Sequence, residues 1–132
     1  MLPVEGSGYF LTKPNEPLEK NSFTIDKVEN DEAVVEIEGC GLCHTDLGFI
    51  AGHVKTNAEL PLILGHEISG KVIAAGKDYQ DLLDKNVIIP AVLPCGECEL
   101  CKNGRSNACR NQKMPGNDFN GGFASHICVP AR

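Results

Sequence analysis

Four cysteines in one short stretch constrain this chain more than any other feature. Three recur at every third residue and a fourth follows after seven more, at Cys95, Cys98, Cys101 and Cys109. Tetrahedral zinc takes four such ligands at about 2.3 Å, and Cys-x-x-Cys steps let one tight loop present several sulfurs to a single point. Because four protein ligands leave no open coordination position, the spacing predicts a structural zinc lobe over about residues 91–113. Any chemistry is then expected elsewhere.

The alternative explanation for these cysteines is a disulfide framework. The segment Met1–Glu5 lacks the basic and apolar regions of a secretory signal, and seven cysteines leave at least one thiol unpaired. Reduced thiols in a cytoplasmic protein are typical of metal binding. We therefore expect zinc thiolates and a cytoplasmic location.

Composition narrows the possible partners. The chain has 132 residues, of which 42% are hydrophobic and 23% charged, with a net charge of −6. This is ordinary for one compact globular domain. Lys and Arg are scattered singly, which argues against nucleic acid, and no apolar run approaches the roughly 20 residues of a membrane span.

Short apolar segments separated by glycine and proline predict a mainly β fold. Val35 and Ile37 alternate with glutamates, which is the pattern of a half-buried strand. A glycine-rich break follows, and residues 47–52 are expected to form a short helix. The predicted strands cover residues 9–12, 23–25, 33–38, 68–76, 87–90 and 123–129. Many short strands with such punctuation favour a β-barrel with few helices.

A second reactive cluster follows the glycine-rich break. Thiol, imidazole, hydroxyl and carboxylate occupy four consecutive positions, Cys43, His44, Thr45 and Asp46. His66 lies in a later Gly-His-Glu motif. A catalytic zinc takes three protein ligands and leaves one position open, and its histidine usually donates its other N–H to a carboxylate. The alternative reading makes His44 a surface residue and Cys43 a core residue.

Three ordered motifs carry a family resemblance. They are residues 41–46, residues 65–70 with Gly76, and the four spaced cysteines. Together they resemble the N-terminal catalytic domain of the zinc-dependent medium-chain alcohol dehydrogenases, whose fold is a GroES-like barrel. The motifs match from about residue 39 to residue 109, and the likeness extends more loosely over residues 1–132.

The resemblance implies a role for each matching residue. Cys43 and His66 would hold a catalytic zinc, and Glu67 would lie behind the metal and could exchange onto it. Thr45 would pass the substrate proton outward, and Asp46 would hydrogen-bond His66. His44 would contact the pyrophosphate of an NAD(P) cofactor. The implied substrate is a small-molecule alcohol, and the implied parent enzyme is a homo-oligomer.

The sequence also departs from the family pattern. It contains neither the family's third catalytic ligand, a later cysteine, nor a G-x-G-x-x-G motif after a strand, so a Rossmann domain is not among these residues. We expect the chain to be part of a longer enzyme and inactive alone. Gly48 stands where many members carry a proton-relay histidine.

Segments outside the metal motifs suggest one branch of the family. Residues 60–62 and 114–126 resemble the 6-hydroxycyclohex-1-ene-1-carbonyl-CoA dehydrogenases, which oxidise a ring hydroxyl to a ketone in anaerobic benzoyl-CoA degradation. Two alternatives remain open: another small-alcohol dehydrogenase, or a non-catalytic zinc-binding barrel. Glu97 and Glu99 lie inside the cysteine loop and argue against a zinc ribbon that binds nucleic acid.

Three further residues are expected to be structural. Cys40 and Cys128 are interpreted as small buried hydrophobic residues. His126, between Ser125 and Ile127, is interpreted as an ordinary strand histidine.

Overall fold

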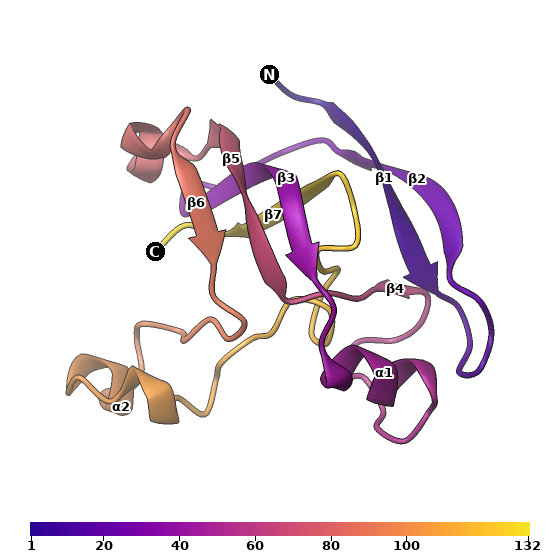
Figure 1. The fold of residues 1–132 in the computed structure, drawn as a ribbon. Coiled ribbons are helices and arrows are strands. Elements are labelled where there is room, and N and C mark those ends of the chain that lie inside the picture. Colours follow the sequence, from indigo (N-terminus) through magenta and orange to yellow (C-terminus); the bar gives the residue numbers. More distant parts are fainter.

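The computed structural model describes all 132 residues as two antiparallel sheets with a few short helices (Figure 1). The three-stranded sheet has the order β2-β1-β4, comprising β1 (Val4–Leu11), β2 (Glu19–Ile25) and β4 (Leu62–Ile63). The four-stranded sheet has the order β6-β5-β3-β7, comprising β3 (Glu32–Gly41), β5 (Glu67–Ala75), β6 (Asn86–Ile89) and β7 (His126–Pro130). The mainly β fold class is confirmed.

The helices are short. They are α1 (His44–Ile50), the 3-10 helix η1 (Lys77–Leu82), α2 (Glu99–Lys102) and the 3-10 helix η2 (Ser106–Ala108). None of them has the length and apolarity that a membrane crossing requires.

The predicted helix over residues 47–52 begins too late. Cys43 is the N-cap of α1, and its backbone N–H donates to the Asp46 carboxylate at 2.9 Å. The Cys43 side chain in turn faces the backbone N–H of Asp46. This capping box satisfies backbone groups that the first turn would otherwise leave unpaired. The helix therefore starts inside the reactive cluster rather than after it.

The predicted strand over residues 33–38 ends too early. Beyond a register shift, Cys40 and Gly41 pair with Ile68 and Glu67 of β5. The glycines thus lie in the strand, where Gly41 faces the Glu67 side chain and a Cβ at residue 41 would collide with that carboxylate. The pairing of Gly41 with Glu67 brings the two reactive motifs side by side.

The predicted strand over residues 123–129 is divided between two partners. Only its second part belongs to β7. In the first part, Phe123 accepts from the backbone N–H of Tyr9 at 2.9 Å, and Ser125 accepts from that of Ile37 at 2.8 Å. Because Tyr9 lies in β1 and Ile37 in β3, this segment ties the two sheets together.

The larger core lies on the four-stranded sheet. Central strand β3 buries Ala33, Val34 and Val35 in succession. Ala33 and Val35 belong to the core cluster and Val34 does not, so both faces of the strand are covered here. Full burial of a valine side chain stabilises by about 1.5–3 kcal/mol. The core cluster contains Ala33, Val35, Ile68, Val72, Ala75, Ile89, Leu93, Ile127 and Val129. A smaller cluster packs α1 against the other sheet through Leu11, Phe49, Leu62 and Leu64.

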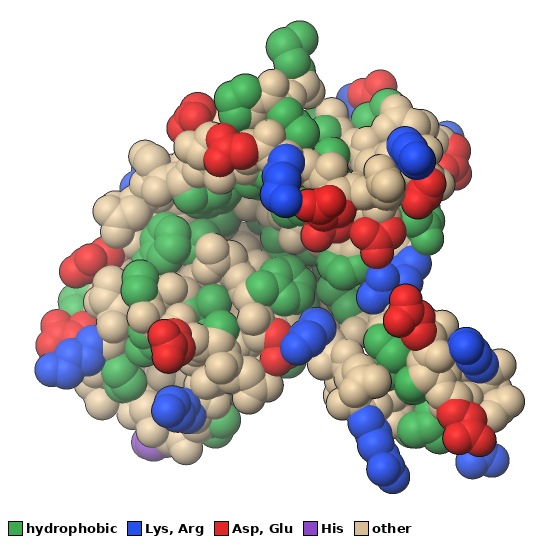
Figure 2. All heavy atoms as spheres, turned by 180° about the vertical axis from the view of Figure 1, so that it is seen from behind, with side chains coloured by type: hydrophobic (Ala, Val, Ile, Leu, Met, Phe, Trp, Pro, Cys, Tyr) green, Lys and Arg blue, Asp and Glu red, His purple; other side chains and the backbone are tan.

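The cysteine-rich segment forms a lobe outside the barrel. The chain leaves after Leu93 and returns at Lys113, and these two residues exchange backbone hydrogen bonds of 2.7 and 2.9 Å. Figure 2 shows the lobe set off from the body by a notch. Arg132 lies against Gly96 of the lobe and pairs with Asp31 of the barrel at 3.2 Å.

Adjacent isoleucines on β6 offer a matched test of this core. Ile89 is 5% exposed and Ile88 is 81% exposed. We expect Ile89→Ala to lower the free energy of unfolding by about 2–5 kcal/mol, because it removes buried methyl groups and leaves a cavity. Ile88→Ala should change it by no more than about 0.5 kcal/mol. Urea unfolding of both variants measures these free energies. Equal losses of stability in the two variants would contradict the structure, in which Ile89 faces the core and Ile88 faces solvent.

Candidate metal centres

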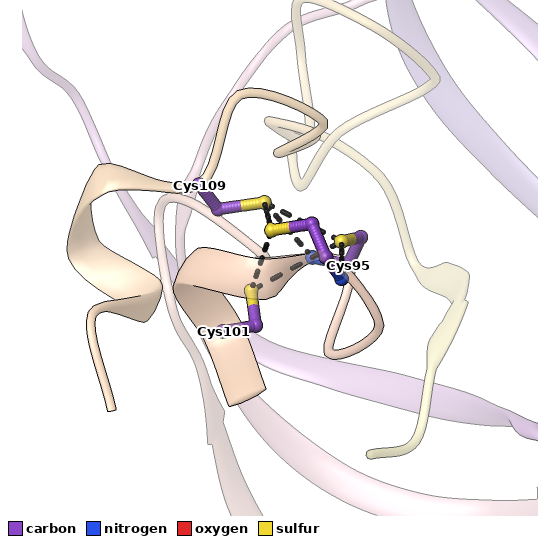
Figure 3. A group of neighbouring side chains, drawn as sticks. Cys95, Cys101 and Cys109 are labelled. Atoms are coloured by element: carbon purple, nitrogen blue, oxygen red, sulfur yellow. Dashed lines mark hydrogen bonds between the residues drawn. The ribbon is translucent and has the colours of Figure 1, made fainter. Parts of the chain in front are cut away.

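The four lobe cysteines converge on one point. Figure 3 shows three of them, Cys95, Cys101 and Cys109, with their sulfurs turned toward one another. The four sulfurs all lie within 4.8 Å of one another. Individual S···S separations are 3.5 Å for Cys98–Cys101 and Cys95–Cys109, 3.8 Å for Cys98–Cys109 and 4.0 Å for Cys95–Cys101. A regular tetrahedron with Zn–S bonds of about 2.3 Å has edges of about 3.8 Å. This donor set therefore fits a zinc ion.

The lobe backbone stabilises the thiolate form of Cys95. Cys98 donates its backbone N–H to the Cys95 sulfur at 3.3 Å. Backbone N–H groups of Glu97 and Cys98 lower the pKa of the Cys95 thiol to about 6, because they stabilise the thiolate. Gly96, with φ 76°, makes the sharp turn that aims these N–H groups at the sulfur.

The second candidate centre is organised by Asp46, which is 0% exposed. Its Oδ2 accepts from the backbone N–H of Cys43 at 2.9 Å, and its Oδ1 accepts from that of Gly65 at 3.2 Å. The same Oδ1 lies 3.5 Å from Nδ1 of His66. One buried carboxylate thus joins the Cys43 motif to the His66 motif across the sheet.

His66 is a buried histidine with one ring nitrogen that lacks a hydrogen-bond partner. It is 6% exposed, and its Nδ1 makes no hydrogen bond although it faces Asp46. Because Nδ1 is turned to the carboxylate, Nε2 is the nitrogen left for a metal. His66 also lines a shallow groove of about 530 Å³ together with Glu67 and Ala91.

Residues 43–45 place their reactive atoms at the start of α1. The Cys43 thiol is half-buried and donates to Oγ1 of Thr45 at 3.7 Å. His44 and Thr45 are exposed on the first turn. They are therefore open to a substrate or cofactor that approaches α1 from solvent.

Glu67 does not join Cys43 and His66 in a compact three-ligand group. Its side chain is exposed and lies against Gly41. The lobe cysteines are the one set of three or more potential ligands that the fold gathers. Coordination of a catalytic zinc by Cys43, His66 and Glu67 accordingly stays a prediction.

The interpretation of Cys128 as a small buried hydrophobic residue needs correction, whereas Cys40 does pack against the larger core. Both are only half-buried, and Cys128 donates its thiol to Oε2 of Glu32 at 3.5 Å. Burial, followed by the nearby Glu32 charge, raises the Cys128 pKa to about 12, and burial also raises the pKa of Cys40. Both remain neutral thiols. His126 pairs only with the neighbouring Ser125 hydroxyl, at 2.9 Å, as an ordinary strand histidine would.

Gly65 is a positioning residue that the sequence analysis placed in a motif without giving it a role. Its φ of 101° is favoured by glycine alone, and this conformation points its N–H at Asp46. The signal was present as a glycine directly before His66, but a glycine before a ligand does not say which side chain its N–H will hold.

Comparison with known proteins identifies the fold family. The alcohol dehydrogenase GroES-like domain family matches residues 29–132. D-arabinose 1-dehydrogenase (NADP(+)) of Saccharolobus solfataricus is 34% identical over 127 residues, which cover 96% of this chain and 36% of that protein. An alcohol dehydrogenase of Geobacillus stearothermophilus is 39% identical over 107 residues, which cover 80% of this chain and 32% of that protein. The chain spans about a third of the length of these curated relatives.

Solved structures show the same relationship. The crystal structure of the D-arabinose dehydrogenase from Sulfolobus solfataricus has a TM-score of 0.83 and 31% identity, over 96% of this chain and 38% of that one. The structure of a cobalt- and zinc-bound thermostable alcohol dehydrogenase from Pyrobaculum aerophilum has a TM-score of 0.85 and 26% identity, over 97% of this chain and 40% of that one. The fold is therefore that of the GroES-like domain of alcohol dehydrogenases. The chain belongs to the zinc-type alcohol dehydrogenase family.

Removing one lobe ligand tests the four-cysteine centre. We expect the chain to bind one zinc ion through Cys95, Cys98, Cys101 and Cys109, and Cys98→Ala to lose that ion together with the stability it provides. The matched control is Cys128→Ala, which removes a thiol outside the cluster. Zinc content and melting temperature measure both effects. Full zinc and unchanged melting in Cys98→Ala would contradict the assignment.

Replacing Asp46 tests the second centre without any metal. In Asp46→Asn, an amide NH₂ must replace one of the two oxygens that accept from Cys43 and Gly65, which leaves a buried donor facing another donor. We expect the metal-free chain to lose about 1–3 kcal/mol of unfolding free energy. Exposed Asp81→Asn serves as the control. Equal stability of the two variants in urea would show that Asp46 does not join the motifs.

Proposed function

We propose that this chain is the catalytic domain of a zinc-dependent alcohol dehydrogenase, which oxidises a small-molecule alcohol and transfers hydride to NAD or NADP. The observation that supports the proposal is the buried Asp46 carboxylate, which accepts from the backbone N–H of Cys43 and lies 3.5 Å from Nδ1 of His66. Relatives named for D-arabinose and for alcohol oxidation support this reaction class.

The donor set fits the implied catalytic metal in part. A thiol and an imidazole are the ligand types that zinc prefers, and the buried, unpaired Nδ1 of His66 is the atom that a ligating histidine offers to a carboxylate. Zinc held by Cys43 and His66 would act as a Lewis acid that lowers the pKa of the substrate hydroxyl. A further ligand would have to come from Glu67 or from outside these residues.

Thr45 is the residue best placed to move the substrate proton. Its hydroxyl lies 3.7 Å from the Cys43 sulfur and is exposed, so it can accept a proton from a substrate beside Cys43 and release it to water. Gly48 in the same helix carries no side chain that could continue the relay. Positioned proton transfer of this kind contributes about 10²–10⁴-fold in rate.

His44 is proposed to contact the cofactor. It occupies the first residue of α1 and is exposed, so its imidazole can reach a phosphate group outside this domain. Asp46 takes no part in proton transfer in this scheme. It fixes the orientation of His66 and the start of α1 at the same time.

A hydroxyacyl-CoA substrate is a narrower hypothesis that rests on sequence resemblance. The residues that suggest it have structural contacts here. The Asp118 carboxylate accepts from the backbone of Met114 at 2.8 Å and from the side chain of Asn57 at 2.9 Å. These bonds hold two loops together and touch neither centre. A substrate panel of 6-hydroxycyclohex-1-ene-1-carbonyl-CoA, D-arabinose and simple secondary alcohols distinguishes the narrow hypothesis from the broad one.

A non-catalytic zinc scaffold is the competing proposal. It requires only the lobe ion, whereas a dehydrogenase requires a second ion at Cys43 and His66. Zinc analysis of the full-length protein containing this domain separates them. Two ions per chain support the enzyme, and one ion without dehydrogenase activity supports the scaffold.

Thr45 substitutions test the mechanism in that full-length protein. Thr45→Val keeps the shape of the side chain and removes the hydroxyl, so kcat should fall by about 10²–10⁴-fold while both zinc ions stay bound. Thr45→Ser keeps the hydroxyl and should stay active. Near-normal turnover in fully metallated Thr45→Val would remove Thr45 from the proton path.

A further inference from the structure

The chain contains two Asn-Gly pairs, Asn103–Gly104 in the lobe and Asn120–Gly121 in the barrel. In an Asn-Gly pair the backbone nitrogen of glycine can reach the asparagine side-chain carbonyl carbon, because no Cβ on the glycine obstructs the approach. Asn103 and Asn120 are both exposed, so composition and exposure alone do not rank their reactivity. Their hydrogen bonds do.

Hydrogen bonds hold both groups that would react at Asn120, its side-chain carbonyl and the backbone nitrogen of Gly121. Its Oδ1 accepts from the backbone N–H of Ile63 at 3.1 Å, and the nitrogen of Gly121 donates to the Ile63 carbonyl at 2.7 Å. Gly121 is buried against the carbonyl of Gly65. Neither the attacking nitrogen nor the side-chain carbonyl is free to rotate.

Asn103 lies at the exposed C-cap of α2, and its side chain has no bond that corresponds to the one between Asn120 and Ile63. Gly104 follows with φ 73° and has open space around its Cα. Two backbone bonds close the helix here, from Gly104 N–H to the Cys101 carbonyl at 3.1 Å and from Arg105 N–H to the Leu100 carbonyl at 2.7 Å. This Schellman arrangement explains why a glycine follows the cap.

We propose that Asn103 is a deamidation site whose reactivity is controlled by metal occupancy of the adjacent four-cysteine cluster. The Gly104 nitrogen attacks Cγ of Asn103 and loses its proton, and the side-chain nitrogen leaves as ammonia, which gives a cyclic succinimide. Water then opens the ring at either carbonyl and yields aspartate or isoaspartate. One water is consumed and one ammonia released, with no oxidant or reductant.

The metal controls this step through Cys101. The ψ of Asn103 is 17°, so the Gly104 nitrogen must rotate toward the side chain and give up its bond to the Cys101 carbonyl. The Cys101 sulfur belongs to the cluster. An ion held by that sulfur fixes α2 and resists the rotation, whereas the metal-free lobe opens more readily.

The modification would damage the centre that restrains it. Isoaspartate adds one carbon to the backbone between Cys101 and Cys109. Either product also places a negative charge at the C-terminal end of α2, where the helix dipole disfavours it. Loss of zinc and deamidation therefore reinforce each other.

Peptide mapping of the aged chain tests the proposal. Cleavage after lysine puts Asn103 in residues 103–113 and Asn120 in residues 114–132, so the two sites report on separate peptides. The chain is incubated at mildly alkaline pH with saturating zinc or with a chelator, and zinc content is measured in parallel. Asn103→Gln is the control variant, because the longer side chain cyclises much more slowly.

In the chelated sample we expect peptide 103–113 to gain roughly one dalton and to split into two isomers, at least about tenfold faster than peptide 114–132 changes. Zinc should slow this conversion, and Asn103→Gln should abolish it. Equal rates in the two peptides, or faster change at Asn120, would overturn Asn103 as the site. Equal rates with and without bound zinc would overturn control by the metal.

Discussion

Burial of the Asp46 carboxylate is the constraint on which the arrangement of the site depends. A charged group at 0% exposure is tolerated only when hydrogen-bond donors surround it, and here the donors are backbone N–H groups from two distant segments. Cys43 supplies one and Gly65 the other. The need to satisfy this carboxylate therefore fixes how the start of α1 meets the start of β5.

The sheet makes this meeting possible. Gly41 at the end of β3 pairs with Glu67 at the start of β5, and each strand is one or two residues from a proposed ligand. The core on the opposite part of these strands holds the pairing in register, since a one-residue slip would turn Val35 and Val72 outward. Packing that is remote from the site thus sets its geometry.

Sequence reasoning succeeded where the signal is local. The cysteine spacing predicted a cluster whose sulfurs do converge, because ligands in one tight loop need little help from the rest of the fold. The alternation around Val35 and Ile37 likewise predicted β3. Segments that depend on tertiary partners were less predictable. The extension of β3 to Gly41 requires β5, and the separation of residues 123–125 from β7 requires β1. The role of Glu67 beside a metal stays a prediction, since the fold shows only that its side chain lies against Gly41.

The closure of the lobe by Leu93 and Lys113 has an evolutionary consequence. The chain enters and leaves the lobe through two residues that are already bonded to each other, so the lobe joins the barrel through a short paired stem, beside which Arg132 contacts Gly96. Whatever lies beyond that stem can lengthen, shrink or lose its metal without changing the path of any barrel strand. A lineage could therefore shorten or lose the cysteine lobe in one deletion and keep the barrel strands, so that selection can adjust the lobe separately from the barrel.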